Sequence, residues 1–354
     1  MKYIDRKYIN IVGMHLKRFK QINNDVWNFR CPYCGDSNKN EFKSRGYFFL
    51  KNDTYIFKCH NCGQTTNLRN FLKYVHGSLY NEYNVEKFKQ HLHKKEVIDE
   101  KIFQTSISFP EKINYDDYLG NRILKKLFKA TDDRKALQYL IDRGFNKKQI
   151  NRFYYVPDIN LITKRIPKYK EKTFKKLSAI IIPFIRYGIV THIQLRILND
   201  EKIRYITLEI EKTDLKIYGC DYVDENKTVY VFEGAFDSIF CNGVALANGN
   251  LHNYKKQLDE LFDDYVLVYD KDLISNRDIL KSAEQAIKNG NKIVLYDKKV
   301  LESEYKDLND LVVNKVIENP ELYLKNNTYK GFKAKIYLDN IKQINKSRKS
   351  LIDI

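Results

Sequence analysis

The chain has 354 residues, of which 63 are Lys or Arg and 45 are Asp or Glu, so its net charge is +18. This length favours two or three domains, and the positive balance favours a polyanionic partner, nucleic acid first, although charge can also serve solubility alone. No export signal is predicted, because the N-terminal residues contain no uninterrupted apolar run, and no membrane span is predicted, because no run elsewhere approaches the roughly 18 apolar residues that a span needs.

Near the N-terminus, four of the six cysteines form two Cys-x-x-Cys pairs, each followed by glycine: Cys31, Cys34, Cys59 and Cys62. Two such knuckles supply four soft thiolates, which suit tetrahedral zinc and leave no ligand position for a reacting water. We therefore expect one structural Zn²⁺ in an N-terminal zinc ribbon, residues 1–95, with His60 as the alternative to one thiolate. This arrangement of cysteines differs from that of a small secreted disulfide scaffold and favours a reducing cytoplasm.

The segment between the knuckles alternates basic and aromatic side chains and predicts a twisted hairpin over residues 43–58. Lys43 and Arg45 are expected to bind nucleic acid through phosphates, while the rings stack on bases. The alternative is that these rings pack the small core of the ribbon. They are Tyr47, Phe49, Tyr55 and Phe57.

Residues 96–114 carry mixed charge with little periodicity, which predicts a linker. Residues 115–227 then begin with helical periodicity that ends near Gly144, as a helix C-terminus would. A loop rich in Lys and Arg, residues 164–176, leads into strands predicted over 178–184 and 188–195. This region is therefore expected to combine helices, a sheet and a basic surface.

From residue 228 onward, apolar strand-like runs alternate with helical stretches, which predicts βα units and a mostly parallel sheet over residues 228–320. The predicted strands are VYVF, YVLVYD and KIVLYD, and the predicted helices are AFDSIFCN, residues 276–289 and residues 308–317. Residues 321–354 form a Lys-rich, partly helical tail. The expected fold class is α/β, or α+β over the whole chain.

Acidic residues follow the predicted strands of this sheet: Glu233, Asp237, Asp270, Asp272 and Asp307. Carboxyl ends of parallel strands face the crevice where open α/β sheets bind ligands, so these carboxylates are expected to converge. Hard oxygen ligands select Mg²⁺ or Mn²⁺, and paired ions suit phosphoryl or nucleotidyl transfer. The alternative is that each Asp caps a helix or lies in a turn.

The motifs Glu233-Gly234-x-x-Asp237, Asp270-x-Asp272 and the later one containing Asp307 resemble, in this order, the TOPRIM domain. With a zinc ribbon before them, the chain resembles the DnaG-type primases, and in particular the stand-alone primases of T-even bacteriophages. The likeness extends over nearly the whole chain. It includes CPYCGDS and CHNCG in the ribbon and the runs IPF, QLR, RYI and KIYG before the TOPRIM motifs.

The resemblance implies a DNA primase, a nucleotidyltransferase that makes short RNA primers on single-stranded DNA. It implies that Glu233, Asp270 and Asp272 are catalytic and, with Asp307, hold Mg²⁺ or Mn²⁺. It also implies that basic residues line the groove for template and primer: Arg196, Arg204 and Lys216. The last acidic motif departs from the commoner Asp-Pro-Asp form and reads Asp307-Leu-Asn309-Asp310, which leaves open which of its residues contacts metal.

The implied partners are a single-stranded DNA template, ribonucleoside triphosphates, a replicative hexameric helicase and a single-strand DNA-binding protein. The tail, residues 321–354, is the expected helicase contact, and a phage-encoded chain would act in the host-cell cytoplasm. No GxxxxGK[ST] phosphate loop is present, so no helicase motor is expected in this chain. Two rival functions remain, a TOPRIM nuclease and a non-catalytic zinc-ribbon adaptor that binds DNA.

Overall fold

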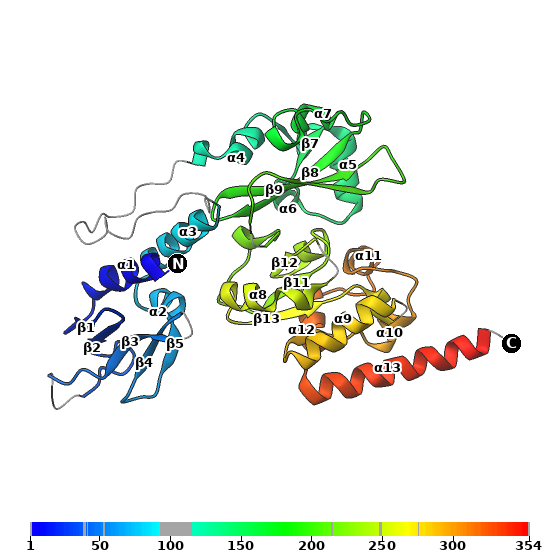
Figure 1. The fold of residues 1–354 in the computed structure, drawn as a ribbon. Coiled ribbons are helices and arrows are strands. Elements are labelled where there is room, and N and C mark those ends of the chain that lie inside the picture. The colour runs from blue at the N-terminus through cyan, green and yellow to red at the C-terminus, as the bar shows by residue number, and fades with distance from the viewer. Residues whose placement is uncertain are drawn as a thin grey trace. The chain divides into compact units, whose positions relative to one another are not determined.

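The computed structural model describes residues 2–37, 40, 42–51, 54–92, 115–213, 215–247, 250–274 and 276–352 (Figure 1). The chain divides into two compact units, Met1–Ile113 and Asn114–Ile354, and each is described by itself. The linker predicted at residues 96–114 lies outside the described residues. Within the described ranges, no helix has the length and apolar character that crossing a membrane requires.

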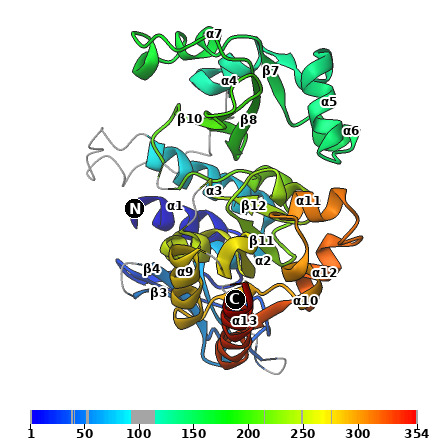
Figure 2. The ribbon, with the colours of Figure 1, turned by 90° about the vertical axis from the view of Figure 1, so that its right-hand side faces the viewer.

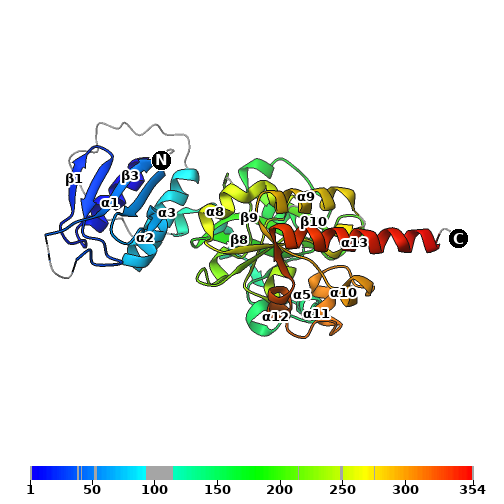
Figure 3. The same cartoon turned by 90° about the horizontal axis from the view of Figure 1, so that it is seen from below.

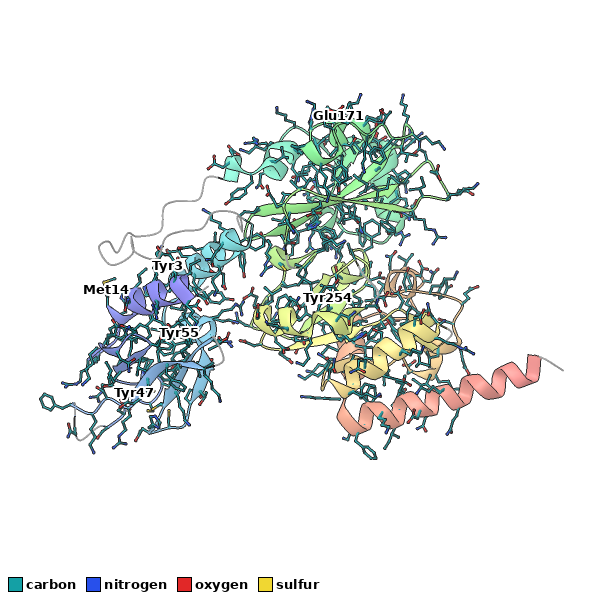
Figure 4. All side chains as sticks on the ribbon, in the orientation of Figure 1. Tyr3, Met14, Tyr47, Tyr55, Glu171 and Tyr254 are labelled. Carbon is teal, nitrogen blue, oxygen red and sulfur yellow. The ribbon has the colours of Figure 1, made fainter. Side chains whose placement is uncertain are left out.

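Unit 1 is built on a five-stranded antiparallel sheet whose strand order follows the chain. Its strands are β1 (Lys20–Asn23), β2 (Val26–Phe29), β3 (Gly46–Lys51), β4 (Thr54–Cys59) and β5 (Thr65–Asn67). Its helices are α1 (Lys2–Gly13), α2 (Leu68–Val75) and α3 (Gly77–Leu92). The predicted hairpin is the pair β3–β4, from which Tyr47 and Tyr55 project, both labelled in Figure 4.

Aromatic side chains form the core of unit 1. Phe29, Phe48, Phe57 and Phe71 are fully buried, and the rings of Phe48 and Phe71 meet edge to face at 4.7 Å. Such contacts add to the free energy gained from burial alone. The alternation of side chains along β3 and β4 thus directs part of the hairpin inward.

The sequence did not decide whether four aromatic rings of the hairpin stack on bases or pack the core, and the structure divides them between core and surface. Tyr55 and Phe57 are buried, whereas Tyr47 and Phe49 are half-buried. The ribbon core therefore takes two of them, as the alternative reading proposed.

Unit 2 begins with an antiparallel five-stranded sheet in the order β10-β9-β8-β7-β6. Its strands are β6 (Phe128–Lys129), β7 (Tyr154–Val156), β8 (Ala179–Arg186), β9 (Ile189–Ile197) and β10 (Tyr205–Glu209). The helices of this part are α4 (Leu119–Leu124), α5 (Arg134–Asp142), α6 (Lys147–Ile150) and α7 (Asn160–Thr163). Helix α5 ends just before Gly144, whose φ of +77° is a conformation that glycine adopts without strain.

The second sheet of unit 2 has the order β12-β11-β13-β14-β15. Its parallel strands are β11 (Val229–Phe232), β12 (Gly243–Ala245), β13 (Tyr265–Val268) and β14 (Lys292–Val294), and β15 (Thr328–Lys330) is antiparallel to β14. Its helices are α8 (Lys255–Leu261), α9 (Arg277–Lys288), α10 (Lys298–Glu302), α11 (Leu308–Val313), α12 (Pro320–Asn326) and α13 (Gly331–Ile352).

Helices cover both faces of this parallel sheet (Figures 2 and 3). Val231 and Leu267 face a core shared with α8, α9 and α13, whereas Tyr230 and Val266 face a core shared with α5, α10, α11 and α12. The second core also takes residues of β8, so it joins the two sheets of unit 2. This layering confirms the predicted α/β fold class.

Three features of the second sheet differ from the sequence-based prediction. AFDSIFCN forms only a short 3-10 helix, η6 (Asp237–Phe240), because β12 already begins at Gly243 and leaves no room for an α-helix. The helix predicted over residues 308–317 ends at Val313. Strand β15 lies within the range assigned to the tail, so the sheet continues past residue 320.

Candidate metal centres and nucleic-acid interface

Four cysteines gather at one end of the sheet in unit 1. The Sγ atoms of Cys31, Cys34, Cys59 and Cys62 all lie within 4.8 Å of one another. Zinc–sulfur bonds of about 2.3 Å place the sulfurs of a tetrahedral site about 3.8 Å apart, and the Sγ atoms of Cys34 and Cys59 are 3.8 Å apart. The four thiols therefore fit a tetrahedral metal ion, while His60 packs edge-on against Tyr47 instead.

The backbone of each knuckle folds back on its first cysteine. The amide N–H groups of Gly35 and Gly63 donate to the carbonyls of Cys31 and Cys59 at 2.9 and 3.0 Å. Both glycines have a positive φ, which explains the residue that follows each pair. Burial raises the pKa of the Cys31 and Cys59 thiols, so a bound cation is needed to hold them as thiolates.

The two basic residues predicted to contact nucleic acid in unit 1 have different surroundings. The side chain of Arg45 donates to Oδ1 of Asn61, and its backbone N–H donates to the carboxylate of Asp36 at 3.1 Å. Arg45 therefore lies beside the second knuckle, whereas Lys43 is exposed.

In unit 2, the first acidic motif forms a tight turn at the carboxyl end of β11. Glu233 follows the strand directly, and a Cβ at Gly234 would lie 2.8 Å from Oδ2 of Asp237. The Asp237 side chain is 8% exposed, and Oδ1 accepts a hydrogen bond of 2.9 Å from the backbone N–H of Asn309. The motif after β11 is thereby tied to the beginning of α11.

Three aspartates interact through their charges at this end of the sheet. Burial, followed by the nearby charges of Asp307 and Asp270, raises the pKa of Asp237 well above its usual range. Asp307 caps α11 by accepting from the backbone N–H of Asp310 at 2.8 Å, and burial raises its pKa too. Clustered carboxylates ionise together only beside positive charge, and these hard oxygen donors fit Mg²⁺ or Mn²⁺.

The two remaining predicted acids lie around the end of β13. Burial and then the charge of Glu233 act together to raise the pKa of Tyr269 to about 12, although a hydrogen bond with Ser282 opposes them, so Glu233 lies near this strand end. Asp272 belongs to the 3-10 helix η8 (Lys271–Ile274), and its side chain lies outside the described part of the chain. The structure thus brings Asp270 and Asp307 within electrostatic range of Asp237, and it places Glu233 near the end of β13.

Sequence reasoning missed Arg143, which the fold brings to these acids from the end of α5. Its Nη1 donates to Oδ1 of Asn309 at 2.8 Å, and Nδ2 of Asn309 donates to the Arg143 carbonyl at 2.7 Å. The guanidinium lies over the rings of Tyr139 and Phe236, and its charge favours ionised Asp307. A single Arg before Gly144 resembles an ordinary helix end, so the sequence gives no signal for this role.

The basic residues predicted to line a groove lie on the first sheet of unit 2. Nε of Arg196, on β9, donates to the hydroxyl of Tyr139 at 2.8 Å, and its guanidinium lies 4.9 Å from the ring centre of Tyr205. Arg204 is exposed at the start of β10. Through Tyr139, Arg196 is connected to Arg143 and hence to the acidic cluster.

Lys216 is exposed and lies near His192, which shares a face of β9 with Arg196. Burial first, and then the charge of Lys216, lower the pKa of His192 to about 4. The three predicted basic residues of unit 2 therefore lie on or beside the hairpin β9–β10.

Comparison with known proteins adds a relative that aligns with this chain over nearly the whole length of both proteins. No family model matches the chain. The DNA primase of Enterobacteria phage T4 is 28% identical over 357 residues, an alignment that covers 97% of this chain and 98% of that protein.

Two solved structures are also similar. One is the Aquifex aeolicus primase, zinc binding and RNA polymerase domains, with 19% identity, a TM-score of 0.49 and coverage of 98% of this chain and 89% of that chain. The other is a DnaG catalytic core, with 18% identity, a TM-score of 0.44 and coverage of 59% and 78%. Over nearly its whole length the chain is similar to the DNA primase of bacteriophage T4, which confirms its resemblance to the primases of T-even bacteriophages.

Proposed function

We propose that the chain is a DNA primase, a nucleotidyltransferase that synthesises short RNA primers on single-stranded DNA. The observation that carries this proposal is the carboxylate cluster at the ends of β11 and β13 and the start of α11, connected through Arg143 and Tyr139 to Arg196 on β9. The whole-length similarity to the T4 primase supports it.

Asp270, Asp272 and Asp307 would hold Mg²⁺ or Mn²⁺, with Glu233 as a further ligand or proton-transfer group. Bound ions of this kind stabilise the attacking and leaving oxygens when a hydroxyl attacks the α-phosphate of a nucleotide and pyrophosphate leaves. Both polar atoms of the Asn309 side chain are hydrogen-bonded to Arg143, which favours Asp307 as the metal ligand of the last motif. Asp237 would support the turn that aims Glu233.

Arg196, Arg204 and Lys216 would hold the phosphates of template and primer, and Lys43 and Arg45 would contact DNA from the zinc unit. The four cysteines would hold one structural Zn²⁺. The proposed domains are the ribbon (1–95), the linker (96–114), the basic region (115–227), the TOPRIM region (228–320) and the tail (321–354).

The proposed partners are single-stranded DNA, ribonucleoside triphosphates, a hexameric helicase that contacts the tail, and a single-strand DNA-binding protein. A phage-encoded chain would act with them in the host-cell cytoplasm.

The test is primer synthesis by the full, zinc-loaded chain on mixed-sequence single-stranded DNA with Mg²⁺ and labelled ribonucleotides, with and without a replicative helicase. Asp270→Ala should abolish the short RNA products. Asp278→Asn is the matched control, because Asp278 is an exposed carboxylate in the first turn of α9. Cleavage of the DNA without RNA synthesis would point to a nuclease, and inactivity of the wild type even with helicase would point to an adaptor.

A further inference from the structure

Lys271 lies between two proposed metal ligands, Asp270 and Asp272, and its side chain does not point freely into solvent. The ammonium donates to the backbone carbonyl of Ser303 and, at 3.1 Å, to the Ser303 hydroxyl. The backbone N–H of Lys271 donates to the carbonyl of Lys306 at 3.3 Å. One residue thus ties the loop after β13 to a second loop at two points.

The second loop leads directly to Asp307. Ser303 caps the C-terminus of α10, where its hydroxyl donates to the carbonyl of Val300 at 2.8 Å and is held in place to accept from Lys271. Residues 304–306 then connect this anchor to Asp307, the N-cap of α11. The hydrogen bonds of Lys271 therefore hold both ends of the segment that precedes Asp307, at Ser303 and at Lys306.

We propose that Lys271 is a positioning residue, which docks on Ser303 and so fixes the spacing of Asp270 and Asp307 for a divalent cation. This proposal rests on the proposed function, which assigns the carboxylates to metal. Groups that orient metal ligands without touching the ion commonly change metal affinity by about 10- to 100-fold when they are replaced.

The direction of the effect distinguishes positioning from a simple charge effect. A lysine ammonium near a cation site repels the cation, so removing the charge alone should tighten metal binding. Loss of a docking contact should weaken it, because Asp270 and Asp307 would then have to be ordered by the metal itself. Lys271→Met removes both the charge and the contact, and the sign of its effect shows which one dominates.

The experiment is a Mn²⁺ titration of the full, zinc-loaded chain followed by electron paramagnetic resonance of free Mn²⁺, a readout independent of activity. We expect Lys271→Met to weaken Mn²⁺ binding by about 10-fold or more. Lys306→Met is the matched control, because it removes an exposed ammonium from the same loop but leaves the backbone tie in place. It should leave the affinity within about two-fold of wild type, as expected for a solvent-screened charge.

Unchanged or tighter Mn²⁺ binding by Lys271→Met would overturn the proposal. A normal Mn²⁺ affinity with a raised KM for nucleotides would overturn it too, because Lys271 would then act on the substrate. Ser303→Ala provides a second, smaller change: combined with Lys271→Met it should add no further loss, whereas additive losses would mean that Ser303 is not the anchor.

The proposed function is tested separately in the same titration. Asp270→Asn combined with Asp272→Asn should abolish the Mn²⁺ site that wild type shows. If that double variant still binds Mn²⁺ like wild type, the assignment of the metal ligands fails whatever Lys271 does. Thermal unfolding of each variant, compared with wild type, reports whether it is folded.

Discussion

At Gly234, the space for a single methyl group decides the geometry of the acidic motif. A Cβ there would lie 2.8 Å from Oδ2 of Asp237, so Gly234→Ala must shift the buried carboxylate, whose other oxygen accepts the hydrogen bond from Asn309. We expect a loss of about 1–3 kcal/mol in the free energy of unfolding and a severe loss of primer synthesis. Chemical denaturation and the primer assay measure the two effects.

Gly77→Ala is the control for this substitution, because an added Cβ at Gly77 meets no atom within 4 Å. Primer synthesis by Gly77→Ala should match wild type. An active and fully stable Gly234→Ala variant would mean that the Asp237 carboxylate can move without consequence.

Asn309 provides a second prediction at the level of one side chain. Its amide both accepts from Arg143 and donates to the Arg143 carbonyl, and the residue is 1% exposed. Asn309→Ala leaves two groups of Arg143 without these partners, which should cost about 1–3 kcal/mol of unfolding free energy. Asn314→Ala, at the exposed C-terminal end of the same helix, should cost far less in the same denaturation series. Equal costs for the two variants would contradict this view of Asn309.

The cysteines and the strand-end carboxylates could be predicted because residue type and local spacing carry their chemistry. Arg143 and Asn309 could not, since they are 166 residues apart in the chain and meet only through tertiary packing. The sequence also could not distinguish which residue of the last acidic motif contacts metal. Its spacing treats Asp307, Asn309 and Asp310 alike, whereas their hydrogen bonds in the folded protein differ.

Among the elements of unit 1, we expect the two knuckles to depend on a bound metal more than the helices do. Both knuckles are short turns closed by the amides of Gly35 and Gly63, whereas α1 and α2 contribute to an aromatic and aliphatic core that includes Tyr8 and Phe71. Zinc chelation should therefore expose the amides of the two glycines to hydrogen exchange before those of α1, and lower the unfolding midpoint of unit 1. Simultaneous loss of protection throughout the unit would show instead that the metal holds its whole fold.

Strands β11, β13 and β14 were predicted from sequence because continuous apolar runs mark strands that are buried on both faces, whereas the three-residue strand β12 was not predicted. The connection from β11 to β12 was predicted incorrectly. The segment AFDSIFCN has a helical pattern, but the start of β12 leaves too few residues for an α-helix. A Cβ at Gly243 would lie 2.4 Å from the Ser238 carbonyl, which shows how closely the chain returns after η6. Strand β15 was missed because an edge strand of three residues has too short a pattern to stand out.

On the scale of the whole of unit 2, the buried carboxylates make stability depend on pH. The raised pKa of Asp237 means that the folded protein holds a proton that the unfolded chain releases. This contribution is complete below the ordinary Asp pKa of about 4 and is lost as pH rises through the raised value. Without Mg²⁺, the thermal midpoint should therefore fall from about pH 5 to pH 8, and added Mg²⁺ should reduce the fall.

Asp237→Asn should flatten this pH dependence in the zinc-loaded, Mg²⁺-free protein, because the amide does not titrate. The comparison is a set of thermal melts of both proteins in the same buffers. Identical slopes for wild type and Asp237→Asn would mean that other groups control the pH dependence.

The excess of positive charge over the whole chain makes binding of single-stranded DNA sensitive to salt. Each phosphate contact on a single strand contributes about 0.7 to the slope of log affinity against log salt. Arg204→Met should therefore weaken binding at low salt and reduce the slope by about 0.7, because Arg204 is exposed and directly precedes β10. Lys298→Met, on α10 and within 3.8 Å of Glu302, should leave the slope unchanged in the same fluorescence-anisotropy titrations. If both substitutions reduce the slope equally, the net charge of +18 attracts DNA without a defined path, whereas a loss confined to Arg204 assigns the strand to the face of β9 and β10.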